Sequence, residues 1–338
     1  MKFRGREAVQ IENDLLRVTV LVEGGHIAEV LHKQSGINPL WQSPWPSIDS
    51  SAYQPVHDAQ FGSGPDNRLL AGIAGHNLCL DLFGPPSDEE AAAGLTVHGE
   101  SSVARYELAA SSAEIHATAH FPLAALRFER RILLDSHHPS VTITETVENL
   151  LPLDRPLAWT QHVTLGPPFL ENGVTRFAHN AIRSQVFGPP SFGESDLQAG
   201  AVFNWPLAPA TEGHSVDLSI FSAKPRSAGF TTHRMDPSSE DAFVTAFHPK
   251  WDLGLTYRWR RSDFPWLGLW EENRSREAPP WNGQTVALGL EFGASPFPET
   301  RRAMIDRGQL FGVPAFRWLG ARKSLTVEYR LEYSSQAV

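Results

Sequence analysis

Short runs of alternating apolar and polar residues recur along this chain, and turn-forming residues separate them. In residues 325–333, Leu325, Val327 and Tyr329 point to one side of an extended chain, and charged or hydroxyl residues point to the other. A period of two is typical of an antiparallel strand with one buried face, so we expect these three residues to be buried. Five further segments share the pattern: 16–22, 115–121, 141–147, 253–259 and 286–292. The 26 glycines and 26 prolines are spread along the whole chain and disfavour long helices. The chain is therefore predicted to be all-β.

One short helix and one domain complete the predicted organisation. A short helix is predicted over 88–93, since the Ser87 hydroxyl can cap its N-terminus and acidic residues occupy its first turn. Three proline-containing stretches, 39–55, 188–193 and 206–213, are predicted to be long surface loops of the kind that often shape binding sites. No linker-like segment and no repeat of fixed period interrupts the strand pattern, so residues 1–338 are predicted to form a single domain.

The charge balance excludes several classes of partner. Lys and Arg number 29 and Asp and Glu number 38, which gives a formal net charge of −9, so no phosphate-binding footprint and no nucleic-acid partner is expected. Neither a signal-peptide pattern nor a run of about 18 apolar residues is visible, so we expect no membrane partner and a cytoplasmic location. The one cysteine, Cys79, lies in an apolar run and is predicted to be a buried, inert thiol.

Glu291 is the most distinctive candidate for chemistry. In residues 285–293, alternation places four apolar residues on the core face and puts Glu291 on the opposite face with Gly289 and Gly293. Glycines two positions away on either side leave the carboxylate without side-chain neighbours on its own strand, as a ligand approaching the backbone would require. Glu291 is therefore predicted to act on a ligand, and a solvated glutamate on an outer face is the alternative.

Two histidines are candidates for proton transfer. His162 shares a predicted strand face with Thr160 and Thr164, and imidazole is the side chain best suited to exchange a proton near neutral pH. His98 precedes Gly99 at the end of a strand-like segment, where the glycine relieves crowding beside the ring. A single histidine is more often structural, so neither residue indicates an active site by itself.

The other histidines do not indicate a metal site, and two tryptophans suggest a binding surface. The 14 histidines include no His-Glu-x-x-His motif, and His116 and His120 lie among small residues without an evident acidic partner, so no metal or cofactor is expected. Trp266 and Trp270 share one face of a predicted strand with a glycine between them. Because sugar C–H faces stack on indole rings, we expect at least one of the two to border a cleft.

Six short motifs follow one another between residues 22 and 291. They are Val22-Glu23-Gly24-Gly25-His26-Ile27, Asn67-Arg68, His98-Gly99, Arg131-Ile132-Leu133-Leu134 with Val147-Glu148-Asn149, Gln161-His162 and Leu290-Glu291. In kind and in order, these motifs resemble those of the aldose 1-epimerase (galactose mutarotase)-like superfamily. The resemblance implies a β-supersandwich, in which two large antiparallel sheets pack face to face.

The resemblance also implies a function and assigns residues to it. It implies a cofactor-free enzyme that interconverts the anomers of an aldose, with a sugar as its partner. Glu291 would be the general base and His162 the general acid, His98 would assist by a hydrogen bond, and Asn67 and Arg68 would orient sugar hydroxyls. If a pyranose bridges the acid and the base, the Glu291 carboxylate is expected about 6–8 Å from the His162 imidazole.

Two other functions are compatible with these residues. Glu291 precedes Phe292-Gly293, where epimerases commonly have Pro-Gln, so a non-catalytic carbohydrate-binding protein is the first alternative. A carbohydrate-cleaving enzyme on the same scaffold is the second, and it would need another acid. Glu145, on the apolar face of its predicted strand, is the only distinctive candidate for that acid, and a core ion pair with Arg130 or Arg131 is the preferred interpretation of it.

Overall fold

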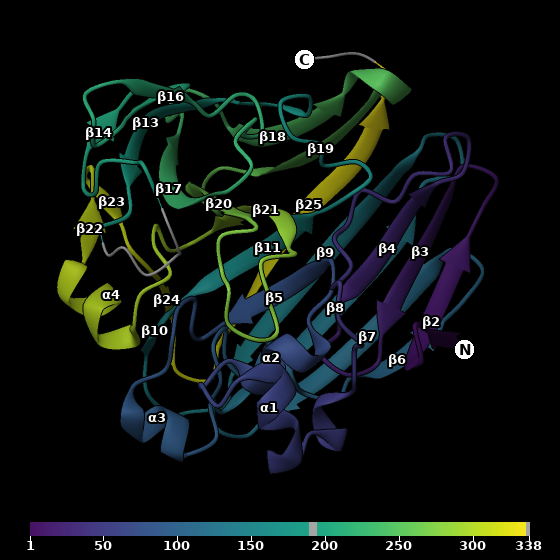
Figure 1. Ribbon diagram of the computed structural model, residues 1–338. Coiled ribbons are helices and arrows are strands. Elements are labelled where there is room, and N and C mark those ends of the chain that lie inside the picture. The colour runs from purple at the N-terminus through teal and green to yellow at the C-terminus, as the bar shows by residue number, and fades with distance from the viewer. Residues whose placement is uncertain (189–194, 336–338) are drawn as a thin grey trace.

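The alternating segments form strands in the computed structural model, which describes residues 1–188 and 195–335 (Figure 1). The six predicted segments correspond to β3 (Leu16–Leu21), β7 (Glu114–Phe121), β9 (Ser140–Asn149), β19 (Leu253–Arg260), β21 (Val286–Gly293) and β25 (Ser324–Ser334). Val327 and Tyr329 in β25 are buried, as predicted. Leu325 is only partly buried, because it is the second residue of the strand, beside exposed Ser324, and packs against the edge of the core.

Most strands belong to two large antiparallel sheets. In the described part of the chain, the first sheet has 11 strands. Their order is β1 (Lys2–Phe3), β2 (Arg6–Glu12), β3, β4 (Ile27–His32), β5 (His76–Leu80), β11 (Trp159–Leu165), β21, β20 (Trp266–Asn273), β17 (Ser227–Met235), β13 (Ala181–Val186) and β14 (Val202–Phe203). The second sheet has the order β12 (Arg176–His179), β18 (Asp241–His248), β19, β25, β9, β8 (Leu126–Leu134), β7 and β6 (Glu107–Ala110).

The main core lies between these two sheets. Val163 and Leu290 from the first sheet and Phe128 and Ile143 from the second belong to one buried cluster. Hydrogen bonds also cross the gap, since the β11 side chains Trp159 and Gln161 donate to Glu145 on β9. The two sheets therefore form the sandwich that the sequence predicts.

The remaining described elements are short and connect the strands. They are β10 (Arg155–Leu157) with β24 (Arg317–Leu319), β15 (Leu207–Pro209) with β16 (Ser215–Asp217), β22 (Gln309–Leu310) with β23 (Val313–Pro314), the 3-10 turns η1 (Ser50–Ala52), η2 (Pro55–His57), η3 (Glu100–Ser102) and η4 (Pro249–Trp251), and the helices α1 (Asp58–Phe61), α2 (Asn67–Gly72), α3 (Asp88–Ala92) and α4 (Arg301–Arg307). The predicted helix is α3, and the Ser87 hydroxyl caps it by accepting from the Glu90 amide at 3.2 Å. In the described residues no helix is long and apolar enough to cross a membrane.

The predicted surface loops have different structures. Segment 39–55 is not a simple surface loop, because Trp41 and Trp45 are buried against the outer face of the 11-stranded sheet. Segment 206–213 contains β15, whose first residue, Leu207, is exposed. Of segment 188–193, all but Gly188 lies outside the described residues.

A second hydrophobic cluster, here called the outer cluster, covers the face of the 11-stranded sheet that points away from the other sheet. Its main members are Trp41, Trp45, Phe61, Leu69, Leu70, Ile73, Phe230, Trp270, Trp281 and Phe297. Phe230 and Trp270 come from β17 and β20, and the other main members come from connecting segments, α1 and α2 among them (Figure 1). The sheet is therefore buried on both faces near its centre.

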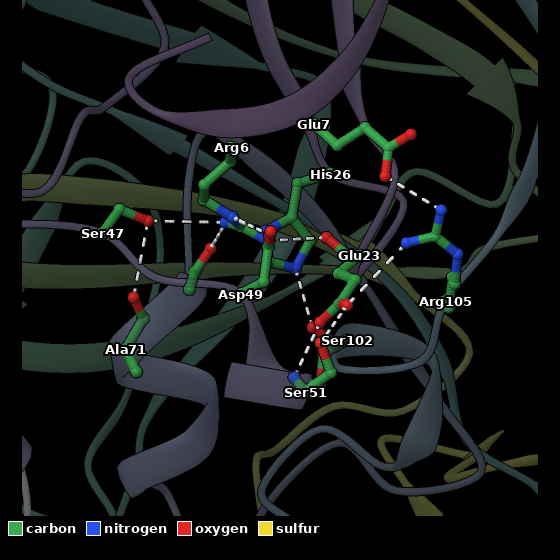
Figure 2. A network of polar contacts seen from close by, with 11 residues as sticks. Arg6, Glu7, Glu23, His26, Ser47, Asp49, Ser51, Ala71, Ser102 and Arg105 are labelled. Atoms are coloured by element: carbon green, nitrogen blue, oxygen red, sulfur yellow. Dashed lines mark hydrogen bonds and ion pairs between the residues drawn. The ribbon is translucent and has the colours of Figure 1, made fainter. Parts of the chain in front are cut away.

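A polar network joins this covering layer to the first strands (Figure 2). Arg6 on β2 is almost fully buried, and its Nε donates to Asp49 at 2.7 Å while its Nη1 donates to the carbonyl of Gly72 at the end of α2. His26 donates through Nε2 to the carbonyl of Ser102 at 2.9 Å, and burial lowers its pKa to about 3. These contacts hold α2 and the turn at η3 in place over the sheet.

Glu145 is an ion-paired core residue. Its Oε1 accepts from Arg130 Nε at 2.8 Å and from the Tyr329 hydroxyl at 2.9 Å, and its Oε2 accepts from Trp159 Nε1 at 3.0 Å. Gln161 Nε2 adds a fourth donor at 2.6 Å. The ion-pair interpretation of Glu145 is confirmed, and the network fixes the inner face of β11 against the second sheet.

Candidate active site

A cavity of about 720 Å³ opens on the outer face of the 11-stranded sheet. Its floor is made of strand residues, with His162 on β11, Glu291 on β21, Trp270 on β20 and Phe230 on β17. Its walls come from α2, from the turn before η3, from the segment after β20 and from α4 with the residues preceding it. The floor is therefore fixed by a hydrogen-bonded sheet, and the walls belong to connecting segments.

His162 and Glu291 are direct cross-strand neighbours in the β11–β21 pairing. Residues directly opposite each other in an antiparallel pair project to the same face of the sheet, which is why both enter the cavity. His162 Nε2 lies 3.1 Å from Glu291 Oε1. The expected separation of about 6–8 Å is wrong. That expectation assumed that the acid and the base lie on opposite sides of a sugar ring. In an aldose, however, the anomeric hydroxyl oxygen and the ring oxygen are both bonded to C1, so two adjacent side chains can reach both.

Glycines around Glu291 make room for its side chain. A methyl group added at Gly289 would lie 2.6 Å from Glu291 Oε1, and one added at Gly268 on the neighbouring strand would lie 2.6 Å from the Phe230 ring. A side chain at either position would therefore collide with the carboxylate or with the cavity floor. The space that the sequence predicts beside Glu291 is occupied by its own carboxyl group and by Phe230.

Burial controls the protonation of this pair. Loss of solvent raises the pKa of Glu291 to about 8, because the apolar surroundings disfavour a carboxylate. Burial, reinforced by the neighbouring His98, holds the pKa of His162 well below its usual range. Thr164 Oγ1 lies 3.0 Å from His162 Nδ1 and can accept its proton, so Nε2 is left to accept from a protonated Glu291. Near neutral pH the pair thus holds one transferable proton.

His98 contacts the same pair from the wall. Its ring centroid lies 5.1 Å from that of His162, and its Nδ1 donates to the carbonyl of Phe83 at 2.7 Å. Burial lowers the pKa of His98 to about 4, so the ring is neutral at pH 7 and its Nε2 can only accept. We therefore revise the predicted role: a neutral His98 can accept from a sugar hydroxyl but cannot donate to a ring oxygen.

Trp270 and Trp266 differ in position although they share a strand face. Trp270 lines the cavity with its ring 5.7 Å from the His162 ring. Trp266 is fully buried outside the cavity lining, where its Nε1 donates to the carbonyl of Pro314 at 3.0 Å. Trp270 alone occupies the predicted position beside the cleft.

Asn67 and Arg68 lie on α2 but outside the cavity lining. The Asn67 amide donates to Asp58 Oδ1 at 3.3 Å, and Arg68 is exposed. Their predicted contact with sugar hydroxyls has no support from this geometry. The helix instead presents Leu69 and Leu70 to the cavity, since these residues follow on its buried side.

Several lining residues were not predicted from the sequence. Arg276 pairs with Glu272 at 3.3 Å and lies over the Trp281 ring at 4.6 Å, and Arg307 makes two hydrogen bonds to Glu299 at 2.7 and 2.8 Å. They lie in irregular segments or a short helix, where no alternation indicates which way a side chain points. Among the described residues no three His, Cys, Asp or Glu side chains are grouped as metal ligands would be, and the absence of a metal stays a prediction.

No protein-family model matches the sequence, and no curated protein does so either. Solved structures do match. A candidate aldose 1-epimerase from Klebsiella pneumoniae superposes with a TM-score of 0.70 at 13% identity, over 98% of this chain and 81% of that one. Galactose mutarotase-like proteins from Clostridium acetobutylicum (TM-score 0.63, 14% identity, 99% and 97% of the two chains) and Lactobacillus casei (0.62, 13%, 97% and 100%) superpose similarly.

The superposition extends over nearly the whole chain and defines the class of fold. This protein has the galactose mutarotase-like fold, the β-supersandwich implied by the six motifs. At 13% identity the likeness concerns the fold, and function has to be argued from the site.

Proposed function

We propose that this protein is an aldose 1-epimerase-like enzyme that interconverts the anomers of a sugar without a cofactor. The observation that supports it is the His162–Glu291 contact of 3.1 Å on the floor of a cavity large enough for a sugar. Anomer exchange requires a base and an acid at two oxygens bonded to one carbon, and a proton-sharing pair supplies both.

In the proposed mechanism, the shared proton first moves from Glu291 to His162 Nε2 across their contact. The resulting Glu291 carboxylate takes the proton of the anomeric hydroxyl while His162 gives its new proton to the ring oxygen. The bond between C1 and the ring oxygen breaks, and the open-chain aldehyde forms. Rotation about the bond between C1 and C2 presents the other carbonyl face, and the two proton transfers then run in reverse. The pair holds one proton before and after the reaction, so no external acid, base or redox partner is consumed.

His98 and Trp270 complete the proposed site. His98 Nε2 would accept from a sugar hydroxyl near C1, because Nδ1 is already committed to the carbonyl of Phe83. The Trp270 ring would stack on the C–H face of the sugar. Asn67 and Arg68 are not assigned a role in this mechanism.

The two alternative functions are less well supported. A binding protein needs no contact between an acid and a base, whereas the floor of this cavity holds such a contact between His162 and Glu291. The carbohydrate-cleaving alternative depended on Glu145, which is buried between the sheets and saturated by Arg130 and three further donors.

The test is NMR exchange between anomers for a panel of neutral, acidic and phosphorylated aldoses. Glu291→Gln is expected to abolish accelerated exchange of an accepted sugar and to leave its affinity within roughly tenfold, since the side-chain shape is retained. Glu107→Gln, on an exposed position of β6, is the matched control and should behave as the wild type. A Glu291→Gln variant as active as the wild type would refute the mechanism, and a wild type that binds a sugar without accelerating its exchange would favour the binding protein.

A further inference from the structure

The cavity is lined by more apolar surface than a bare monosaccharide could use. Among the described residues, its apolar lining consists of Leu69, Leu70, Ile73, Val97, Val186, Phe187, Phe230, Trp270, Trp281 and Phe297, with three prolines and Ala303 besides. An unsubstituted aldose carries a hydroxyl on almost every carbon. Each hydroxyl that loses water against such a wall lacks a hydrogen-bond partner, which is unfavourable.

The size of the cavity also exceeds the needs of one sugar ring. A volume of about 720 Å³ falls within the range of roughly 300–1,000 Å³ that is typical of pockets for drug-sized ligands. A pyranose held by His162 and Glu291 would cover the floor. The space below α2 and beside Phe297 would remain for a second group attached to the sugar.

The charged groups in the lining do not indicate an anionic substituent. Both described lining arginines already have carboxylate partners, Arg307 with Glu299 and Arg276 with Glu272. Asp66 contributes a further acidic side chain to the lining. A phosphate or carboxylate on the sugar would have to compete with these internal partners, so a neutral substituent is favoured.

A few polar atoms remain to position the ring. Trp270 Nε1 and Gln185 Oε1 are buried in the lining and have no hydrogen-bond partner among the described residues. Together with His98 Nε2 they offer one donor and two acceptors in the cavity lining. Three such polar atoms are fewer than the hydroxyls of an unsubstituted aldose, and they suit a sugar ring of which one or more hydroxyls are substituted.

We propose that the substrate is an aldose with a free anomeric carbon and an apolar group, such as an aryl or alkyl ether, on another carbon. This inference rests on the proposed function of the same site. The sugar ring lies over His162 and Glu291, and the apolar group packs in the outer cluster between Leu70, Val97 and Phe297.

The experiment compares D-glucose and D-galactose with their 3-, 4- and 6-O-benzyl ethers and their 6-phosphates. Anomer exchange is measured by NMR, and binding is measured by tryptophan fluorescence and calorimetry. At least one ether is expected to exceed its parent sugar in kcat/KM by tenfold or more. A parent sugar or a 6-phosphate that equals or exceeds every ether would overturn the inference.

The same panel separates failure of this inference from failure of the proposed function. If the protein accelerates anomer exchange of no sugar in the panel, the epimerase proposal fails, and binding affinity alone tests the apolar-substituent inference. An ether that binds at least tenfold more tightly than its parent sugar supports that inference, and equal or undetectable binding refutes it. Val97→Thr places a hydroxyl in the wall at constant shape and should reduce the ether-to-parent ratio at least threefold. Val9→Thr, at a similarly half-buried position on β2, should leave that ratio unchanged.

Discussion

Replacing Glu291 by glutamine should make the folded protein more stable at alkaline pH, although it removes a proposed catalytic group. The pKa of Glu291 is raised from 4.5 to about 8 by burial, so between these values the folded protein holds a proton that the unfolded chain has released. Stability therefore falls as the pH rises through this range. At about 1.4 kcal/mol per pH unit, the carboxyl lowers the free energy of unfolding by about 5 kcal/mol at pH 8.

The variant escapes this penalty, but its amide N–H is a weaker donor to His162 Nε2 than the carboxyl O–H. The weaker bond costs about 1 kcal/mol. The difference in free energy of unfolding between Glu291→Gln and the wild type is thus expected to rise from near zero at pH 5 to about 4 kcal/mol at pH 8. The lowered pKa of His162 affects both proteins and largely cancels from the difference.

Urea denaturation followed by tryptophan fluorescence at intervals from pH 5 to pH 8 measures this difference. Glu107→Gln, on the exposed strand β6, is the control and should differ from the wild type by less than about 0.5 kcal/mol throughout. A Glu291→Gln difference that stays constant with pH would refute the reasoning, because it would mean that the carboxyl ionises equally readily in the folded and unfolded protein.

Three further predictions follow from the site and the core. For an accepted sugar, kcat/KM should fall above about pH 8, where Glu291 loses the shared proton. The activity should persist well below pH 6.5, because burial lowers the pKa of His162. A kcat/KM that rises beyond pH 9 would contradict this prediction. Gly289→Ala should lower kcat/KM at least tenfold, since the methyl group would lie 2.6 Å from Glu291 Oε1, and an unchanged rate would mean that the carboxylate position is unimportant. Glu145→Ala should lower the free energy of unfolding by about 3–5 kcal/mol, because Arg130 is left buried and unpaired, and adding Arg130→Met should recover most of the loss in thermal denaturation.

The strands and their faces could be predicted because alternation reports burial directly. Along β21, the apolar residues at even positions enter the main core and Glu291 faces the cavity. The same argument identified Glu145 as a charged residue on a core face, and a charge in that position requires a partner, which is Arg130. Both inferences use only the period of two and the cost of burying a charge.

The walls of the site could not be predicted, because their residues lie on turns and short helices without a usable period. Asn67-Arg68 matches a family motif by residue type, yet the next two residues, Leu69 and Leu70, face the cavity. A shift of one residue along the helix changes which side chains face the cavity. Trp266 and Trp270 are equivalent in the strand pattern, and only the position of the covering segments separates a core ring from a lining ring. The distance between His162 and Glu291 depends on strand register, which a single strand does not reveal.

The division between a floor made of strands and walls made of connecting segments has a consequence for redesign. β11 and β21 are central strands whose backbones are paired on both sides, so their geometry does not depend on what lies above them. Substitutions in segments 65–73 and 297–307 are therefore expected to change the shape of the cavity while His162 and Glu291 keep their places on the floor. Substitutions in 65–73 must retain the backbone carbonyl that accepts from Arg6, because that contact anchors α2 to β2.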